Sequence, residues 1–429
     1  MNYLIIGGSA AGVYCAESIR SVDKKGKITL ISDESLLLYS RCLLTYLLAG
    51  DISIEKAKFK DIDFYKNHDI EVISGVTALA LDIKNKAVKL SNKKEIGFDK
   101  LLIATGARPA TLKIPGVDKK GVFTIRKIDD VEGIEKELDR VKTVCVLGGG
   151  LIGLRDAYAL NKRKKDVKVI VKSPQILSQM LDKDGADIIQ KRLEENGIQI
   201  LTLKDAKEII GKEKAEAVVL DDGGKIDCQL VIIGKGVVPN KEIAEKAGIK
   251  VDWGIVVNEY LETSGKDIYA AGDVAQAYDI VEGKSNINAL WPVAAQQGKM
   301  AGLNMAGEKV KYDGSLGMNS LDFYELVTIS IGITKPELQG GTEQLVRRGV
   351  NCYKKLILKN DVLCGAVLVG SVENAGIYNS LIKKKINIAE FKHLLLEDKF
   401  NYASILPLVK KNIDVFKEQE YKDTTLTYL

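Results

Sequence analysis

The sequence contains little histidine and no closely spaced cysteines, and both shortages narrow the chemistry that we expect. Only His68 and His393 are present, so acid–base catalysis by histidine has few candidates. The six cysteines are widely spread and include no CxxC pair, which argues against a zinc site, an iron–sulfur cluster or a redox dithiol. We therefore predict no metal site.

Long apolar runs and a large net charge are also missing. No apolar run is long enough to span a bilayer. The first strand is expected from Tyr3, which leaves no room for a signal peptide, and we predict a cytoplasmic protein. The 63 basic and 58 acidic residues leave a net charge of only +5, which gives no case for nucleic-acid binding.

What the chain does have is a glycine-rich turn between a strand and a helix at its start. Residues 2–20 read NYLIIGGSAAGVYCAESIR: an apolar run of strand length, a turn of small residues and a helix-forming segment. Such a unit presents free backbone N–H groups that can hold a pyrophosphate. Gly7 allows the sharp turn and Gly12 lets the helix approach the strand, while Ser9 stands where the usual fingerprint has its middle glycine.

The same pattern returns later in the chain. Residues 143–153, TVCVLGGGLIG, contain a complete GxGxxG at Gly148, Gly150 and Gly153. A helix is expected at residues 154–161 and a strand at 167–171. Two such units in one chain predict two bound dinucleotides, and the 429 residues allow roughly two to four domains.

Two carboxylates follow the predicted second strand, Lys27–Ile31. Asp33 and Glu34 lie about twenty residues past the first glycines, where a carboxylate can accept hydrogen bonds from an adenosine ribose. Glu34 is the preferred candidate, with Asp33 close behind. The alternative is that these residues form a helix cap or a solvated turn.

Four further segments complete the expected organisation. The pattern predicts an apolar helix over residues 36–50, with Arg41 and Cys42 near its start, and a small antiparallel sheet within 199–222. A helix with Pro292 in its first turn is expected over Trp291–Met305. Strands at 353–358 and 362–369, joined by a tight turn, indicate an appended α+β domain.

The order of motifs resembles that of the pyridine nucleotide–disulfide oxidoreductase superfamily, in the branch of rubredoxin reductases, nitrite reductase flavin domains, NADH oxidases and coenzyme A-disulfide reductases. The resemblance rests on GGSAAG, YSRCLL, LLIATGARP, GGGLIGL, GVVPN, TSGKDIYAAGDV and WPVAAQQG, in that order. It implies an α/β fold with two Rossmann-like three-layer domains. FAD would be bound by residues 1–112 and 241–309, and NAD(P) by 113–240. Residues 310–429 would form a C-terminal α+β interface domain, usually in a homodimer.

The resemblance also implies which residues bind each cofactor. Arg41 would approach the FAD phosphates, Val76 the adenine, and Asp273 the ribityl hydroxyls, while the helix after Pro292 would point its N-terminus at the flavin. The full FAD set is Gly7, Gly8, Ser9, Ala10, Ala11, Gly12, Asp33, Glu34, Arg41, Val76, Ala104, Thr105, Gly106, Gly272, Asp273, Pro292 and Val293. The NAD(P) set is Gly148, Gly149, Gly150, Leu151, Ile152, Gly153, Arg155, Val171, Lys172 and Gly234.

Three positions depart from the family pattern. Arg155 replaces a glutamate that reaches toward the nicotinamide, and it either stays there or swings away to pair with Asp156 or Glu194. Val171 and then Lys172 stand where a ribose-binding acid is usual, which leans toward tolerating a 2′-phosphate and leaves NADH and NADPH both open.

The third departure is Cys42, which holds the register of the single redox cysteine of NADH oxidases and coenzyme A-disulfide reductases. Near a helix N-terminus its pKa would be lowered and the thiolate favoured. The alternative is an ordinary small side chain.

We therefore predict an FAD-dependent NAD(P)H oxidoreductase that passes a hydride between nicotinamide and FAD. It would exchange electrons with a protein carrier, either rubredoxin or another iron–sulfur protein. One alternative is a Cys42-dependent reductase of coenzyme A disulfide or persulfide, or an NADH oxidase. Another is a non-catalytic flavoprotein subunit of a larger redox complex.

Overall fold

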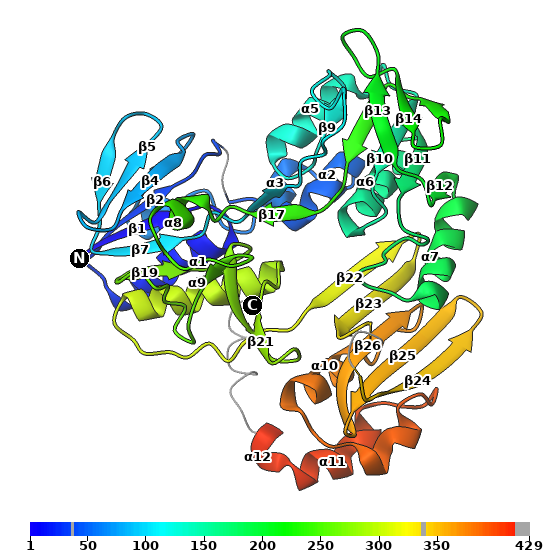
Figure 1. Ribbon diagram of the computed structural model, residues 1–429. Helices are drawn as coiled ribbons and strands as arrows, with labels where there is room; N and C mark the ends of the chain where they lie inside the picture. The colour runs from blue at the N-terminus through cyan, green and yellow to red at the C-terminus, as the bar shows by residue number, and fades with distance from the viewer. Residues whose placement is uncertain (36–37, 336–339, 417–429) are drawn as a thin grey trace. The chain divides into compact units, whose positions relative to one another are not determined.

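The computed structural model describes residues 1–35, 38–335 and 340–416, which divide into two compact units (Figure 1). The first unit comprises Met1–Ser178 and Leu193–Ser315, and the second comprises Gln179–Arg192 and Leu316–Leu429. Within the described ranges, every helix is too short or too polar to cross a membrane. The fold is α/β, as predicted.

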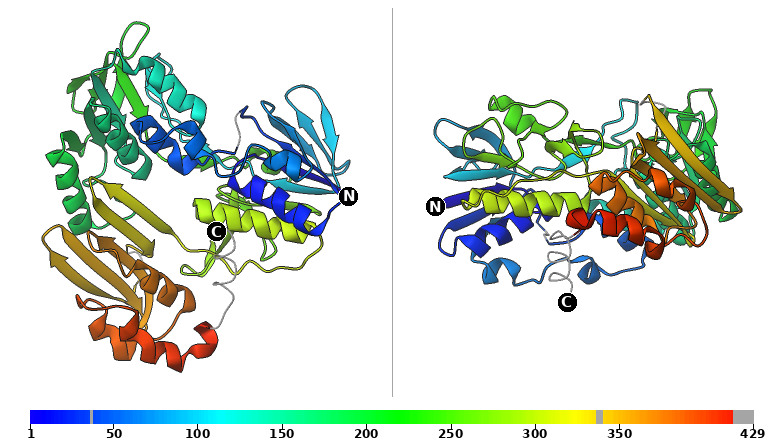
Figure 2. Two further views of the ribbon diagram at one scale, coloured as in Figure 1. Left: turned by 180° about the vertical axis from the view of Figure 1, so that it is seen from behind. Right: turned by 90° about the horizontal axis from the view of Figure 1, so that it is seen from below.

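The first unit begins with a five-stranded parallel sheet in the order β19-β7-β1-β2-β3. Its strands are β1 (Asn2–Ile6), β2 (Lys27–Ile31), β3 (Ile70–Ile73), β7 (Lys100–Ile103) and β19 (Ile268–Ala270). The central strand β1 is buried along almost its whole length, as strands covered on both faces are. Helices α1 (Ala10–Val22) and α9 (Trp291–Met305) lie side by side against it (Figures 1 and 2). The prediction for α9 is confirmed at both ends.

A second five-stranded parallel sheet in the same unit has the order β12-β11-β10-β16-β9. Its strands are β9 (Val122–Phe123), β10 (Thr143–Leu147), β11 (Asp166–Val171), β12 (Ile198–Thr202) and β16 (Leu230–Ile233). Helices α5 (Ile128–Leu138) and α6 (Leu151–Lys162) belong to this half of the unit. The chain therefore contains two parallel sheets, each with a glycine turn after its central strand, as the duplicated motif predicted.

The predicted antiparallel sheet within residues 199–222 is wrong in part. Strand β12 pairs parallel with β11, so it belongs to the large sheet. The antiparallel sheet consists of β13 (Ala206–Ile210), β14 (Ala217–Leu220) and β15 (Lys225–Asp227). Alternating hydrophobicity identified the strands but not their pairing partners. Side chains alternate with a period of two residues in parallel and in antiparallel sheets, so the pattern does not distinguish them.

The predicted helix over residues 36–50 is shorter than expected. Residues 36–37 lie outside the described part of the chain, Arg41–Leu43 form the 3-10 turn η1, and helix α2 covers only Leu44–Ala49. Before that turn Tyr39 forms an antiparallel bridge with Lys58, and the Ser40 N–H donates to the Ala57 carbonyl at 2.8 Å. This pairing holds the backbone extended, so the helix starts later than its apolar composition predicts.

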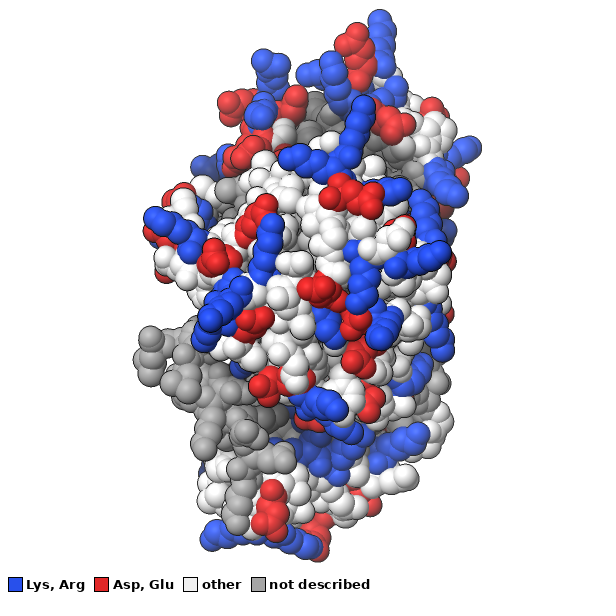
Figure 3. Space-filling view, turned by 90° about the vertical axis from the view of Figure 1, so that its left-hand side faces the viewer, with Lys and Arg blue, Asp and Glu red and all other residues white. Residues whose placement is uncertain are grey.

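Smaller elements complete the first unit. The sheets are β4 (Ala78–Asp82), β5 (Ala87–Leu90) and β6 (Glu95–Gly97); β8 (Ala107–Pro109) with β17 (Val237–Pro239); and β18 (Ile255–Val256), β20 (Ala275–Asp279) and β21 (Lys284–Asn286). The short helices are α3 (Ile54–Ala57), α4 (Phe64–Asn67) and α8 (Glu242–Lys246). On the face shown in Figure 3 basic and acidic side chains are interspersed, in line with the nearly balanced composition.

The second unit contains a five-stranded antiparallel sheet in the order β22-β23-β26-β25-β24. Its strands are β22 (Met318–Phe323), β23 (Leu326–Gly332), β24 (Thr342–Gly349), β25 (Cys352–Lys359) and β26 (Val362–Val369). The sequence predicted only the last two of these. The helices are α10 (Ala375–Lys384), α11 (Leu406–Lys411) and α12 (Ile413–Phe416), with 3-10 turns η3 (Ala389–Leu394) and η4 (Tyr402–Ile405). Most of α7 (Lys183–Glu195) also groups here.

Candidate functional site

The two glycine turns have the same local geometry. Gly7 after β1 has φ +121° and Gly148 after β10 has φ +134°, a region that disfavours any residue with a Cβ. A Cβ on Gly7 would overlap the Ala104 carbonyl oxygen after β7, and one on Gly148 would overlap the Gly234 carbonyl oxygen after β16. Each turn is therefore pressed against the end of the neighbouring strand, which brings Ala104 and Gly234 to the predicted nucleotide sites.

Three long helices of the first unit start without a side-chain cap. The N-cap residues are Ser9 for α1, Gly150 for α6 and Leu290 for α9, and none of them accepts a capping hydrogen bond with its side chain. The first N–H groups of these helices therefore remain available to an anion. A Cβ built on Gly150 would meet no atom within 4 Å, so the turn has open space where a phosphate would approach. This cradle fits the pyrophosphate of a dinucleotide.

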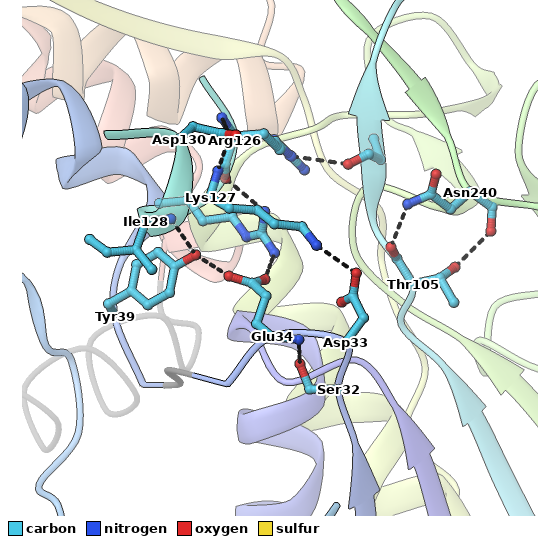
Figure 4. Close-up of polar contacts among 12 residues, drawn as sticks. Ser32, Asp33, Glu34, Tyr39, Thr105, Arg126, Lys127, Ile128, Asp130 and Asn240 are labelled. Carbon is cyan, nitrogen blue, oxygen red and sulfur yellow. Dashed lines mark hydrogen bonds and ion pairs between the residues drawn. The ribbon is translucent and has the colours of Figure 1, made fainter. Parts of the chain in front are cut away.

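A buried carboxylate lies beside the first turn (Figure 4). Glu34 is only 8% exposed and contacts both the Tyr39 hydroxyl and the Arg41 guanidinium. Arg41 in turn donates to the Arg126 carbonyl oxygen at 2.8 Å, and the Tyr39 hydroxyl accepts from the Ile128 N–H at 3.2 Å. The structure thus brings Glu34 and Arg41 together, and Tyr39 is a member of the cluster that the sequence did not indicate.

Asp33 behaves differently from its neighbour. Its side chain is half exposed and pairs with Lys127 at 2.6 Å (Figure 4). Lys127 lies directly before α5, and the Asp130 carboxylate accepts from the backbone N–H groups of Arg126 and Lys127 at 2.7 and 2.8 Å. The start of α5 is therefore tied to the end of β2 through side chains far apart in the sequence.

Arg126 is a site residue that the sequence reasoning missed. Its guanidinium donates to the Asp273 carboxylate at 2.7 Å and to the Ala107 carbonyl oxygen at 3.0 Å. Asp273 is the predicted ligand of the ribityl hydroxyls, so Arg126 orients it. A single arginine in the segment TIRKIDD carries no distinctive signal. Only the following Asp130, which caps α5, marks the place.

The turn after β7 is fixed from the other side. The Thr105 hydroxyl donates to the Asn240 carbonyl oxygen at 2.8 Å, and the Asn240 amide donates to the Thr105 carbonyl oxygen at 2.9 Å (Figure 4). The Asn240 N–H also donates to the Gly106 carbonyl oxygen at 2.9 Å. Residues 104–106 and the GVVPN motif are therefore one rigid corner.

The remaining predicted FAD residues lie at the same edge of the sheet. The Gly272 N–H donates to the Gln297 side chain of α9 at 2.8 Å, which joins the Asp273 turn to this helix. Pro292 and Val293 form the first turn of α9. The Val76 N–H donates to the Ser32 carbonyl oxygen at 2.9 Å, which holds residue 76 beside the end of β2.

Cys42 lies in the 3-10 turn before α2, where the residue as a whole is exposed although protein atoms surround the sulfur. Loss of water around the thiol raises its pKa, and the nearby Asp273 charge adds to this, while Ser40 and Arg126 oppose it. The expectation of a lowered pKa is therefore wrong for this structure. Cys42 lies in a 3-10 turn and not in the first turn of an α-helix, and the Asp273 charge disfavours the thiolate.

Arg155 and Asp156 lie on α6 but in different surroundings. The Arg155 guanidinium lies 4.4 Å from the ring centre of Tyr46 on α2. Asp156 is fully buried, and neither carboxylate oxygen has a hydrogen-bond partner within the described ranges. The predicted pairing of Arg155 with Asp156 is therefore wrong. Burial raises the pKa of Asp156 well above its usual value.

The second turn collects the predicted NAD(P) residues. A Cβ on Gly149 would lie 2.7 Å from the Val171 side chain, so the turn packs directly on the end of β11. Leu151, Ile152 and Gly153 form the first turn of α6. Lys172, the next residue after β11, pairs with Asp205 at 3.2 Å. The sequence reasoning did not single out Asp205.

Two family models match the chain. The model described as pyridine nucleotide-disulphide oxidoreductase matches residues 1–298, and the model described as rubredoxin NAD+ reductase C-terminal domain matches residues 318–386. The first match includes both glycine turns and the Glu34–Arg41 cluster.

Individual proteins agree with these models. The chain is 34% identical over 452 residues to an NADH oxidase from Methanocaldococcus jannaschii, covering 98% of this chain and 99% of that protein. It is 31% identical over 373 residues to an NADH-rubredoxin oxidoreductase from Clostridium acetobutylicum, covering 86% and 91%. Its structure is similar to a NAD-dependent persulfide reductase from A. fulgidus, with a TM-score of 0.86, 26% identity and coverage of 96% and 84%.

Proposed function

This chain belongs to the pyridine nucleotide-disulphide oxidoreductase family, and we propose that it transfers electrons between a nicotinamide nucleotide and a small iron-containing redox protein. It is an oxidoreductase that uses FAD and NADH or NADPH. The redox partner is the proposed part, supported by the match of residues 318–386 to the C-terminal domain of rubredoxin reductases.

FAD, when bound, accepts a hydride and releases electrons one at a time. We assign its binding to the first sheet, with the N-terminus of α1 and Arg41 at the phosphates, Glu34 at the adenosine ribose, and Asp273 oriented by Arg126. The uncapped start of α9 favours negative charge in front of it. We assign the nicotinamide nucleotide to the turn at Gly148–Gly153 in the second sheet.

The properties of the cysteines favour a one-electron carrier over a disulfide as the reaction partner. All six cysteines are free thiols, and Leu47 stands where a dithiol enzyme would need a second cysteine after Cys42. Burial raises the pKa of the Cys42 thiol and so disfavours the thiolate, which thiol–disulfide chemistry needs. Without a redox-active thiol, the electrons would be held on the flavin, which can pass them one at a time to an iron centre.

Anaerobic stopped-flow mixing tests this proposal. The enzyme would be reduced with NADH or NADPH and mixed with oxidised rubredoxin or a [2Fe–2S] ferredoxin, while the bleaching of each iron centre is followed. We expect rapid reduction of at least one carrier, and the same rate in Cys42→Ser. Failure to reduce any iron protein, together with turnover of disulfides, would contradict the proposal.

A thiol-dependent reductase is the second candidate, and the exposure of Cys42 favours it. Cys42 is the exposed cysteine residue, whereas Cys352 and Cys364 are partly buried and the other three are buried. A reductase of coenzyme A disulfide or persulfide would lose activity in Cys42→Ser. A long-wavelength charge-transfer band during anaerobic titration would show a thiolate beside the flavin, and its absence favours the electron-carrier function.

The family resemblance also supports a homodimer. We propose that the second unit contributes to the interface. Sedimentation equilibrium would then give twice the chain mass of 46.9 kDa. A monomer at micromolar concentration would contradict this.

A further inference from the structure

The edge of the second sheet contains an ion cluster that the proposed function has not used. The sheet order is β12-β11-β10-β16, and all three pairings are parallel, so the carboxyl ends of these strands meet at one edge. Lys172 follows β11, Asp205 lies after β12, and Lys235 follows β16 by two residues. The Gly148 turn leaves the same edge from β10.

Asp205 is the centre of this cluster. Its carboxylate accepts a hydrogen bond from Lys235 at 2.8 Å and lies 3.2 Å from the Lys172 ammonium group. The Lys172 side chain is 77% exposed, whereas Asp205 and Lys235 are only 23% and 22% exposed. In sheet order, the two lysines follow strands on opposite sides of β10. The cluster therefore connects the strand ends that flank the glycine turn.

The carboxylate is ionised at neutral pH. Partial burial raises the pKa of Asp205, but the hydrogen bonds from Lys235 and Lys172 outweigh this and hold the pKa below its usual value. The position is also fixed from the backbone, since the Lys204 N–H donates to the Val171 carbonyl oxygen at 3.2 Å. Residues 204–205 are thereby attached to the end of β11, where this type of fold binds the adenosine ribose of a dinucleotide.

We propose that Asp205 recognises the ribose 2′-hydroxyl of NADH and makes the enzyme prefer NADH over NADPH. This inference rests on the proposed binding of the nicotinamide nucleotide at Gly148–Gly153. Asp205 supplies from β12 the carboxylate that Val171 does not supply at the end of β11. A 2′-hydroxyl donates to Asp205 without breaking either lysine contact.

A 2′-phosphate meets the opposite situation. It carries close to two negative charges and would lie beside an ionised carboxylate. The lysines that would attract it already pair with carboxylates: Lys172 and Lys235 with Asp205, and Lys204 with Asp222. Lys172 considered alone favoured tolerance of a 2′-phosphate. Its pairing with Asp205 favours the opposite preference.

The test compares Asp205→Asn with wild type and with Asp227→Asn. Asp227 is the control, because it also pairs with a lysine, Lys225, whereas the lysines of the argument pair with Asp205 and Asp222. Anaerobic stopped-flow reduction of the bound flavin gives the ratio of second-order rate constants for NADH and NADPH. We expect wild type to favour NADH, and Asp205→Asn to shift the ratio toward NADPH by on the order of tenfold. Asp227→Asn should keep the wild-type ratio.

A binding measurement separates recognition from catalysis. Calorimetric titration of the purified holoenzyme with 5′-AMP and with adenosine 2′,5′-bisphosphate should show weaker binding of the bisphosphate to wild type and a reduced difference in Asp205→Asn. An unchanged preference in Asp205→Asn, or an equal shift in Asp227→Asn, would overturn the role of Asp205. If neither nucleotide reduces the flavin, the proposed function itself fails.

Discussion

At the scale of single residues, Arg155 and Asp156 show how neighbours in sequence reach different environments. Arg155 stacks on Tyr46, whereas Asp156 points into the core without a hydrogen-bond partner in the described part of the chain. A buried, unpaired carboxyl group is costly to ionise. Asp156 is therefore expected to keep its proton at a pH where the unfolded chain has lost it.

Asp156→Asn should change how stability depends on pH. The folded-state pKa of Asp156 is raised, so its contribution to stability is fully present below the unfolded pKa near 3.8 and is lost as pH rises toward the folded pKa. We expect the variant to be more stable than wild type by about 1–3 kcal/mol at pH 8, with a smaller gain at pH 5. Urea denaturation at both pH values measures this. Asp61→Asn, at an exposed position, is the control, and a gain that does not grow with pH would contradict the prediction.

Arg126→Ala should weaken FAD binding. The substitution leaves Asp273 without its guanidinium partner and removes the donor to the Ala107 carbonyl oxygen. We expect the Kd for FAD to rise on the order of tenfold, measured by flavin fluorescence during reconstitution of apoprotein. Arg348→Ala, which breaks an exposed pair with Asp184 in the second unit, should leave the Kd unchanged. Equal effects of the two substitutions would refute a specific role for Arg126.

At the scale of elements, α1 packs closely against the second half of α9. A Cβ on Gly298 of α9 would overlap the Ala11 carbonyl oxygen of α1, and one on Gly302 would lie 2.5 Å from the Cys15 carbonyl oxygen. Small residues at these positions let the two backbones touch. The separation of the helices is therefore set by two glycines one turn apart.

Gly298→Ala should push these helices apart. We expect a loss of stability of about 1–3 kcal/mol and easier release of FAD, because both helix starts face the proposed cofactor. Thermal unfolding and flavin release on dilution measure the two effects. Gly376→Ala in α10 is the control: a Cβ there meets no atom within 4 Å, so it should be neutral or slightly stabilising. A Gly298 variant as stable as wild type would show that the helices can adjust.

At the scale of the whole molecule, the chain crosses between its two units more than once. Gln179–Arg192 leaves the first unit and joins the second, although it lies in the middle of the sequence. Asp182 in this segment accepts from the Tyr353 hydroxyl at 2.6 Å and from Lys355 at 2.8 Å, and the Lys355 side chain is only 5% exposed. The second unit is therefore completed by a segment from far upstream.

Asp182→Asn should loosen the second unit selectively. Hydrogen bonds from Lys355 and Tyr353 overcome the effect of burial and lower the pKa of Asp182. Its contribution is therefore present above the unfolded pKa near 3.8 and is lost as pH falls through the folded value. At pH 7 we expect a loss of about 1–3 kcal/mol, seen as faster hydrogen exchange in β25 and β26 than in wild type. Asp184→Asn breaks an exposed pair with Arg348 and should have little effect. Uniform loosening of both units would argue against the prediction.

The sequence by itself determined the two strand–turn–helix units, their order and the class of cofactor. These features depend on residues adjacent in the chain: Gly7 and Gly148 are needed where the backbone turns at positive φ, and Pro292 is compatible with the first turn of a helix but not with its interior. Turns and helix starts can therefore be predicted from the few residues that form them.

The tertiary structure alone decided the partners of charged side chains and the length of one helix. Arg126 meets Asp273, and Lys172 meets Asp205, only because parallel strands bring their ends to one edge. The start of α2 was likewise set by the bridge between Tyr39 and Lys58. Such pairings join positions far apart in the chain, and no local pattern records which distant residue a side chain will contact.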